Sequence, residues 1–592
     1  MRLSSLNFIA ILLISAAVNA NFLGPRFSPP THFTGDSLVA ASWKNLGSNL
    51  DAYLQGNRQG VESSLLEGLE NLTFSLGMFS VHDPAAETLQ YHYTSKEVAN
   101  GKGAKEVDGN SIYRVASVSK LFSVYAGMLV FSDEQWNQPI TDFVPRLSKS
   151  TLDKITTDSI HYIQWEDVTL RALASQIAGI PRDAQPVLSD IALDPVTYLG
   201  VPDPTSLGLP PLDLVNDPST IAPCLIVSDP VNDCTADLYF EGTEQRLPVF
   251  QSWTTPAYTN NGFILLGIAL ANITGKPIAQ VYPDTIFDPL GMKDSRSNPP
   301  ESEWSQYVIP AGGEAGWSAP GGISISSGGL LSSLNDMAKF GTAILNHTLL
   351  PEHKTRQWLK PISHSAQFEF SVGTPWEIYR YKHADTGAIT DIYTKLGDSG
   401  NYTGFVCLVP DYDAGFTVLS AGSNVTQKSV LASTIADLIT TTILPALEAQ
   451  AAMETENNFA GIYTSTISGL NSSITISYND TPAAPGLYIT SWISNNTNLL
   501  PLLPFLTGSP LKLQPSLSQP GQSAFLARPV AVPGAYLGPF GRMREVDGDW
   551  LFGEGLTYGA VGLGQVVFDV DGGGWARGVE LLAFRSFLER VG

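Results

Sequence analysis

The sequence predicts a protein of the α/β class, more narrowly α+β, in which a large mixed domain precedes a smaller β-rich module. Residues 77–115 contain short apolar-polar alternations separated by turns, a pattern typical of strands. From Ser117 the apolar side chains recur every three or four positions, which indicates a buried helix that begins near Ala116. Beyond Asn457 the pattern changes to alternating strands punctuated by Gly and Pro.

The strand alternation and the helical repeat also predict further elements. An apolar run at 263–272 ends in a Gly-Lys-Pro stop signal and predicts a helix. Helical patterns return near 334–345 and over 423–450. The strands expected after them include 474–478 and 486–493, which alternate as half-buried strands do.

These patterns predict three parts of unequal size. A leader at 1–20 precedes the mixed domain, which covers 21–450, and the β-rich module covers 457–592. Within the mixed domain, residues 182–250 are rich in Pro, Asp and Leu and show no sustained period. We interpret this segment as a long insertion.

The leader predicts secretion. Residues 1–20 combine Arg2, a short apolar run and a small-residue end, which is typical of a signal peptide cleaved before Asn21. The other long apolar runs, 124–131 and 263–271, are shorter than the roughly 18 residues that a membrane-spanning helix needs, so no membrane segment is expected. A secreted chain exposes its Asn-x-Ser/Thr sequons to glycosylation, here at Asn71, Asn272, Asn346, Asn401, Asn424, Asn471, Asn479 and Asn495.

Composition excludes some classes of function. The 592 residues carry 33 Lys and Arg against 56 Asp and Glu, a net charge of −23, which excludes a nucleic-acid partner bound through a basic surface. Cys224 and Cys234 lie close together in the insertion and predict a local disulfide, whereas Cys407 lies in an apolar run and predicts a buried free thiol. The histidines show no ligand spacing, so we expect no metal and no cofactor.

Ser117 and Lys120 form the first candidate catalytic motif. Three positions apart on a helix, the hydroxyl and the ammonium lie on one face, where a desolvated lysine can take the proton of an attacking serine. The helix N-terminus adds a positive dipole. A chance surface pair is the alternative for this motif taken alone.

Two further segments carry suitable chemistry. Tyr258 and Asn260 precede an apolar helix; a phenol beside a lysine can act as a general base, and the amide can orient a substrate, although a capped loop tyrosine is the alternative. Lys395, Leu396 and Gly397 precede a strand, where the glycine would let a substrate backbone approach and the lysine would add positive potential.

In this order the three segments resemble the serine β-lactamase-related family, the group of class C β-lactamases, DD-peptidases and esterases. The resemblance covers about 370 residues, from 77 to 447. It includes the nucleophile segment and five further stretches, namely Tyr113–Phe122, Trp136–Leu147, Val168–Pro181, Pro256–Gly267, Pro289–Met292 and Gly328–Phe340.

The resemblance implies an antiparallel sheet flanked by helices, beside an all-helical subdomain, with the nucleophile at their junction. It implies that Ser117 is the nucleophile, Lys120 its proton partner and Tyr258 the general base. Asn260 would orient the substrate and Lys395 would lower the pKa of Tyr258. The N–H groups of Ser117 and Asp398 would form the oxyanion hole.

The sequence also departs from the family pattern. Many relatives have a His-x-Ser-Gly segment where this chain has Gln176 to Gly179, so the role of that histidine is expected to be absent. Leu396 stands where relatives that bind a carboxylate place a hydroxyl, and the insertion predicts an unusual outer wall. The β-rich module resembles the lipocalin-like extension of some fungal members.

The first functional hypothesis is a secreted serine hydrolase that cleaves an ester or amide of a small-molecule acyl substrate. Acyl transfer to a small-molecule alcohol, as in the tailoring of a secondary metabolite, is a second hypothesis, because any acceptor that outcompetes water can intercept an acyl-enzyme. A third is a non-catalytic secreted binding protein of the same fold. The sequence does not indicate an oligomeric state.

Overall fold

The structure is a computed structural model of the chain. It describes two single residues, 191 and 537, and the ranges 24–57, 63–148, 158–184, 195–212, 236–482, 484–502, 511–529 and 556–591. The predicted leader at 1–20 and the predicted disulfide between Cys224 and Cys234 lie outside the described residues and stay predictions. Cys407 is free and buried, as expected.

The chain divides into two compact units. Of the described residues, those within 32–380 and 391–446 form the sheet unit, and those within 24–31, 381–390 and 447–591 form the barrel unit. The sequence patterns assign 381–390 to the mixed domain, whereas in the structure this segment belongs to the barrel unit. The tip of the hairpin at 381–390 therefore belongs to the barrel unit, whereas the chain on either side of it belongs to the sheet unit.

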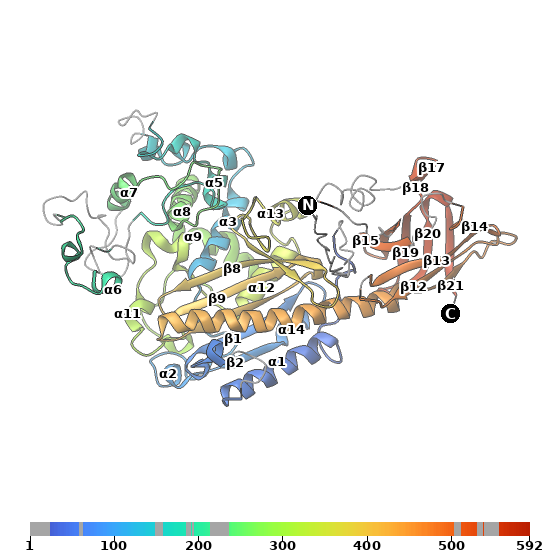
Figure 1. The fold of residues 1–592 in the computed structure, drawn as a ribbon, viewed down its shortest axis with the longest axis horizontal. Helices are drawn as coiled ribbons and strands as arrows, with labels where there is room; N and C mark the ends of the chain where they lie inside the picture. The colour runs from blue at the N-terminus through green and yellow to red at the C-terminus, as the bar shows by residue number, and fades with distance from the viewer. Residues whose placement is uncertain are drawn as a thin grey trace, which may run out of the picture. The chain divides into compact units, whose positions relative to one another are not determined.

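The mixed domain is built on an eight-stranded antiparallel sheet, as the family resemblance implies (Figure 1). Its strand order is β2-β1-β10-β9-β8-β7-β6-β5, so β1 pairs with a strand that follows more than 300 residues later. The strands are β1 (Thr73–Ser80), β2 (Gln90–Tyr93), β5 (Ser363–His364), β6 (Phe370–Val372), β7 (Glu377–Lys382), β8 (Ile389–Ser399), β9 (Tyr402–Val409) and β10 (Ala414–Ala421).

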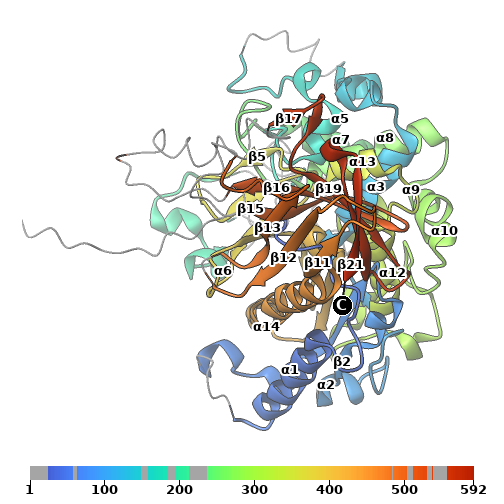
Figure 2. The same ribbon diagram turned by 90° about the vertical axis from the view of Figure 1, so that its right-hand side faces the viewer.

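Helices cover both faces of this sheet. Helix α12 (Leu334–Leu345) packs on β1, β9 and β10 and matches the predicted helix residue for residue. Figure 2 shows α1 (Leu38–Leu54) and α14 (Val425–Phe459) together, apart from α12. The Tyr91 hydroxyl of β2 donates to Asp51 of α1 at 2.7 Å, which fixes α1 to the sheet.

Helix α14 is longer than the sequence pattern predicts. It continues past residue 450 to Phe459, because Ala, Glu and Met in this stretch are strong helix formers. Among the described residues, α14 is the one unbroken helix whose length and composition would suit a membrane span. Of its most apolar 18-residue stretch, 56% is buried inside the protein. The broken pair 260–274 and 278–290 passes the same test only when taken together.

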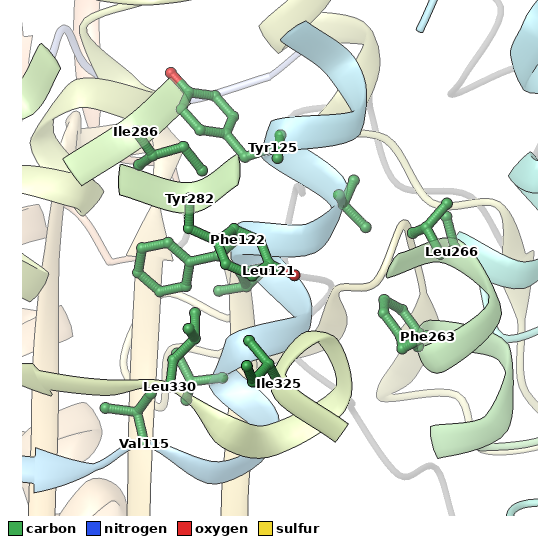
Figure 3. Close-up of a cluster of buried hydrophobic side chains, with 14 of the residues drawn as sticks. Val115, Leu121, Phe122, Tyr125, Phe263, Leu266, Tyr282, Ile286, Ile325 and Leu330 are labelled. Carbon is green, nitrogen blue, oxygen red and sulfur yellow. The ribbon is translucent and has the colours of Figure 1, made fainter. Parts of the chain in front are cut away.

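The predicted helix after Ala116 is confirmed, but it is buried on all sides rather than on one face. A short 3₁₀ turn, η4 (Ala116–Val118), leads into α3 (Ser119–Val130), whose first nine residues are all buried. Figure 3 shows why: Phe122 and Tyr125 lie among side chains near Tyr282, while α8 brings Phe263 to the other side. This packing holds the start of α3 rigidly.

The remaining short elements complete the mixed domain and its helical part. They are α2 (Lys96–Ala99), β3 (Ile112–Arg114), α5 (Leu170–Ala174), α6 (Pro195–Leu199), α7 (Ala236–Gln245), α8 (Asn260–Thr274), α9 (Ile278–Tyr282), α10 (Asp288–Leu290), α11 (Glu314–Ser318), the π-turn η13 (Ile325–Gly329), β4 (Leu331–Ser333) and α13 (Glu352–Trp358).

The β-rich module is a closed barrel of eight antiparallel strands, which confirms the predicted all-β, lipocalin-like module. Each strand pairs with its neighbours around the ring, and β12 closes the ring with β13. Phe459 of α14 lies in the barrel core, 4.9 Å from the rings of Phe525 and Phe568, so side chains fill the interior. The strands are β11 (Gly461–Thr464), β12 (Ser473–Asn479), β13 (Gly486–Ser494), β15 (Leu511–Gln519), β16 (Gln522–Pro529), β19 (Gln565–Val570), β20 (Ala576–Leu581) and β21 (Ser586–Val591), with three short strands, β14 (Thr497–Asn498), β17 (Thr557–Tyr558) and β18 (Val561–Gly562).

Candidate active site

Ser117 lies on the tight turn between β3 and α3. Ala116, just before it, has a φ of +45°, a left-handed conformation that costs energy for a residue with a Cβ. Neighbouring contacts hold this turn: the Val115 N–H donates to Leu330 at 3.1 Å, and the Ser119 hydroxyl donates to the Ala116 carbonyl at 2.6 Å. The sequence thus presents Ser117 at the start of a buried helix, on a constrained turn.

Lys120 is fully buried directly behind Ser117. Its Nζ donates to Ser117 Oγ at 2.9 Å, to Asn260 Oδ1 at 2.7 Å and to the Ser327 carbonyl at 2.5 Å. All three acceptors are neutral. Burial therefore lowers the pKa of Lys120 to about 8, although the nearby Tyr258 hydroxyl opposes the shift.

Tyr258 contacts Ser117 from the other side. Its hydroxyl and Ser117 Oγ are hydrogen-bonded at 2.6 Å. Lys120 Nζ lies 4.9 Å and Lys395 Nζ 5.2 Å from the centre of its ring. Burial raises the pKa of the Tyr258 phenol, but the two lysines outweigh burial and lower the pKa below its ordinary value. The structure thus brings the three predicted motifs together around one hydroxyl.

Lys395 lies on β8 and forms a buried ion pair that no motif of the sequence predicts. Its Nζ binds Glu377 of β7, and the second carboxylate oxygen of Glu377 accepts from the Leu396 N–H at 2.8 Å. Lys395 also donates to the Leu396 carbonyl at 2.8 Å. The pair therefore joins two neighbouring strands and directs a cation at the Tyr258 ring.

Gly397 allows a close approach between β8 and the turn that carries Ser117. A Cβ at this position would lie 2.1 Å from the Val115 carbonyl oxygen and 3.2 Å from the Ser117 nitrogen. In the structure the turn that carries the nucleophile occupies this space, so Gly397 sets the distance between Ser117 and β8. The predicted approach of a substrate backbone to this strand stays a prediction.

Asp398 follows Gly397, and its side chain binds residues other than Ser117. Its carboxylate binds Lys428 of α14 and accepts from the Thr403 hydroxyl at 2.8 Å. Burial raises the pKa of Asp398, but the Lys428 ammonium and the hydrogen bonds from Lys428, Thr403 and Ser429 together outweigh burial and lower the pKa. Only the backbone N–H of Asp398 is left for the oxyanion role that the family resemblance implies.

Asn260 opens α8, and Gln176 supports the turn before it. The Gln176 side-chain carbonyl accepts from the Thr259 N–H at 2.7 Å, and the Thr259 hydroxyl caps the helix by accepting from Gly262 at 3.0 Å. The expectation that the role of the family's histidine is absent stays a prediction. What Gln176 does in this chain is hold the Tyr258–Asn260 segment.

Both ends of the insertion reach the same segment. At its start, Asp183 accepts from the Asn260 side chain at 2.7 Å, and the Arg182 guanidinium lies 6.0 Å from the centre of the Tyr258 ring. At its end, Tyr239 and Thr243 donate to the Asn261 side chain. No local signal in the sequence predicts these contacts, because the insertion has no regular pattern.

The other predicted sites are spread over the surface. Among the eight sequon asparagines, Asn401 and Asn479 are half-buried, and the other six are exposed. The Asn401 amide donates to the Gly422 carbonyl at 3.1 Å. Within the described ranges, no group of three or more His, Cys, Asp or Glu side chains is arranged to hold a metal ion.

A serine hydroxyl held between a lysine and a tyrosine can lose its proton to either and attack an acyl carbon. An antiparallel sheet that meets a helical subdomain at such a serine defines one class, the β-lactamase-like hydrolases. Comparison with known families agrees. The family model described as Beta-lactamase matches residues 86–439, and the chain belongs to this family.

A second family model, described as Beta-lactamase-like-like, C-terminal domain, matches residues 451–592. The chain is 30% identical to a beta-lactamase-like protein of Arthroderma benhamiae over 76% of this chain and 70% of that one. It is 26% identical to the probable hydrolase clz13 of Cochliobolus lunatus, over 72% of this chain and 68% of that one. A class C β-lactamase structure from Rhodobacter sphaeroides aligns with 66% of this chain and 99% of its own, at 18% identity and a TM-score of 0.44.

Proposed function

We propose that this protein is a secreted serine hydrolase that cleaves an ester or amide bond of a small-molecule substrate through an acyl-enzyme on Ser117. One observation carries the proposal: Ser117 Oγ lies within hydrogen-bond distance of both Lys120 Nζ and the Tyr258 hydroxyl. Both partners have lowered pKa values, which suits proton acceptors near neutral pH. The predicted signal peptide and sequons support secretion.

The proposed reaction has two stages. Ser117 transfers its proton to the Tyr258–Lys120 pair as Oγ bonds to the acyl carbon, and the carbonyl oxygen takes the negative charge. The N–H groups of Ser117 and Asp398 would stabilise that charge. The same pair returns the proton to the leaving alcohol or amine. Water then attacks the acyl-enzyme, gives its proton to the pair and releases the acid as Ser117 recovers a proton.

Active-site labelling tests the proposal without knowledge of the natural substrate. A fluorophosphonate probe should form one adduct, on Ser117, as located by peptide mass spectrometry, and Ser117→Ala should abolish it. No adduct on the folded wild-type protein would support a non-catalytic binding role instead. Product analysis of an activated ester in water, with and without an alcohol acceptor, separates hydrolysis from acyl transfer. Detection of the protein in the culture medium, beginning at Asn21, tests secretion.

A further inference from the structure

The Asn260 side chain lies between two charged groups of opposite sign. Its Oδ1 accepts from Lys120 Nζ at 2.7 Å, and its Nδ2 donates to Asp183 Oδ1 at 2.7 Å. Asp183 is the second residue of the insertion, and no motif of the sequence marks it. The contact joins the insertion to the lysine that touches Ser117.

The two charges permit only one orientation of the amide. If the Asn260 amide turned over, its NH₂ group would face the Lys120 ammonium and its carbonyl oxygen would face the Asp183 carboxylate. Both hydrogen bonds would be lost, and like partial charges would meet at both ends. Without the carboxylate, the amide has a bound partner on one side only.

Asp183 is itself held in place. Its second oxygen lies 3.4 Å from the Arg182 guanidinium, and its side chain is 37% exposed. The Arg182 carbonyl accepts from the N–H groups of Asn260 and Asn261 at 2.7 and 2.9 Å. The start of the insertion is therefore fixed to the first turn of α8, which fixes the carboxylate relative to the amide.

We propose that Asp183 is a positioning residue of the site: it sets the orientation of the Asn260 amide and, through that amide, holds Lys120 against Ser117. This inference rests on the proposed function. It makes the start of the insertion part of the catalytic apparatus rather than an outer wall alone. Since only one hydrogen of the Asn260 NH₂ group binds Asp183, the other remains for the substrate.

The test compares rates of Ser117 labelling by the fluorophosphonate probe. We expect Asp183→Asn to label at least about tenfold more slowly than wild type, because a neutral amide at 183 accepts either orientation of Asn260 and leaves Lys120 alone to orient it. Asp203→Asn is the matched control, since Asp203 is an exposed residue of the same insertion whose carboxylate binds only Thr205 among the described residues. It should label at the wild-type rate.

A double-mutant cycle shows whether Asp183 acts through Asn260. In an Asn260→Ala background, Asp183→Asn should change the rate less than about twofold. An equal loss in both backgrounds, or a loss below about twofold in wild type, would overturn the inference. If wild type itself is not labelled at Ser117, the proposed function fails, whatever Asp183 does.

Two further measurements distinguish positioning from a purely structural role. Asp183→Glu keeps the charge, so it should recover at least half of the decrease in the logarithm of the labelling rate. Its unfolding midpoint should equal that of wild type. If it labels as slowly as Asp183→Asn, or if both variants fail to fold, the inference fails. The acid limb of the pH–rate profile should move to lower pH in Asp183→Asn, because an Asn260 amide that turns over no longer accepts from Lys120, and that hydrogen bond favours the charged form of Lys120. Tyr258, Lys395 and Glu377 also face Lys120 and are unchanged in the variant.

Discussion

Two sides of the site each bring a buried lysine to the same phenol, and the two lysines differ in their partners. Lys120, on the helix side, contacts a hydroxyl, an amide and a carbonyl, whereas Lys395, on the strand side, binds the carboxylate of Glu377. Their Nζ atoms lie 4.9 and 5.2 Å from the centre of the Tyr258 ring. The two ammonium groups therefore lie at similar distances from the Tyr258 ring but bind different partners.

The difference assigns different tasks to the two lysines. A buried ammonium with neutral partners loses its proton easily, and the pKa of Lys120 falls to about 8. An ammonium paired with a carboxylate remains a fixed source of positive potential. We infer that the helix side of the site moves protons, while the strand side sets the electrostatic field in which they move.

The largest effect should come from the hydroxyl that the two sides share. Ser117→Ala should lower turnover of an activated ester by at least about a thousandfold, because the nucleophile is lost. Alanine is small and the turn is held by backbone contacts, so the unfolding midpoint should stay close to that of wild type. Retention of a tenth of the activity, or a probe adduct on another serine, would contradict the assignment.

A smaller loss of labelling rate is expected for a change at Gly397, where the Ser117 turn packs against β8. Gly397→Ala would place a methyl group 2.1 Å from the Val115 carbonyl oxygen, so the Ser117 turn must move away from β8. A displacement of this kind costs about a hundredfold in rate. Gly316→Ala is the control, since a Cβ at that position meets nothing within 4 Å. Equal labelling rates for both variants would show that the spacing is unimportant.

Local signals predicted the helix side well. The helix over 334–345 was predictable because Ser333 caps it and its apolar period is regular. The start of the helix at Ala116 was likewise predictable from its period and its Ser-x-x-Lys motif. The burial of α3 on all sides was not, because it depends on segments such as α8 and η13 that are distant in sequence.

The charged partners could not be predicted in the same way. Glu377 lies 18 residues from Lys395, and Asp183 lies 77 residues from Asn260. Each is one of 56 acidic residues, and nothing in its local sequence distinguishes it. Motifs identify groups that react, whereas the groups that orient them become visible only when the fold brings distant segments together.

The ion pair on the strand side offers a test of the proposed division of tasks. Glu377→Gln leaves the buried Lys395 without its countercharge and should cost about 3–5 kcal/mol of unfolding free energy, measured by denaturant titration. The double variant Glu377→Gln with Lys395→Met removes both charges and should be close to wild type in stability. If the single and double variants are equally stable, the pair is not a buried ion pair in solution.

The double variant should also shift the pH dependence of Ser117 labelling. Lys395 lowers the pKa values of both Lys120 and Tyr258, and its effect on Lys120 is larger than the opposite effect of Glu377, so both pKa values should rise when the pair is removed. The acid limb of the pH–rate profile then moves to higher pH. At a fixed pH below this limb, labelling slows about tenfold for each pH unit of the shift. Lys354→Met, which changes the charge at the surface, should leave the limb in place. A shift to lower pH would contradict the role of Lys395.

The last expected effect concerns substrate choice on the strand side and rests on Leu396. Its N–H and carbonyl are bound to Glu377 and Lys395, so only its side chain remains to meet a substrate. β-Lactams carry a carboxylate beside the scissile bond, and leucine cannot donate a hydrogen bond to it. The missing charge-assisted bond corresponds to about 1.5–3 kcal/mol, or about ten- to more than a hundredfold in kcat/KM.

We therefore expect neutral short-chain esters to be turned over at least about tenfold more efficiently than nitrocefin, with kcat/KM measured for p-nitrophenyl butyrate and nitrocefin on one preparation. Lys395 and the exposed Arg182 still supply positive potential, so the result should be discrimination rather than exclusion. Leu396→Thr should raise nitrocefin turnover, whereas Leu396→Val, which has the same shape as threonine without the hydroxyl, should not. Efficient nitrocefin hydrolysis by wild type, or equal turnover by the Thr and Val variants, would show that the hydroxyl at this position does not select the substrate.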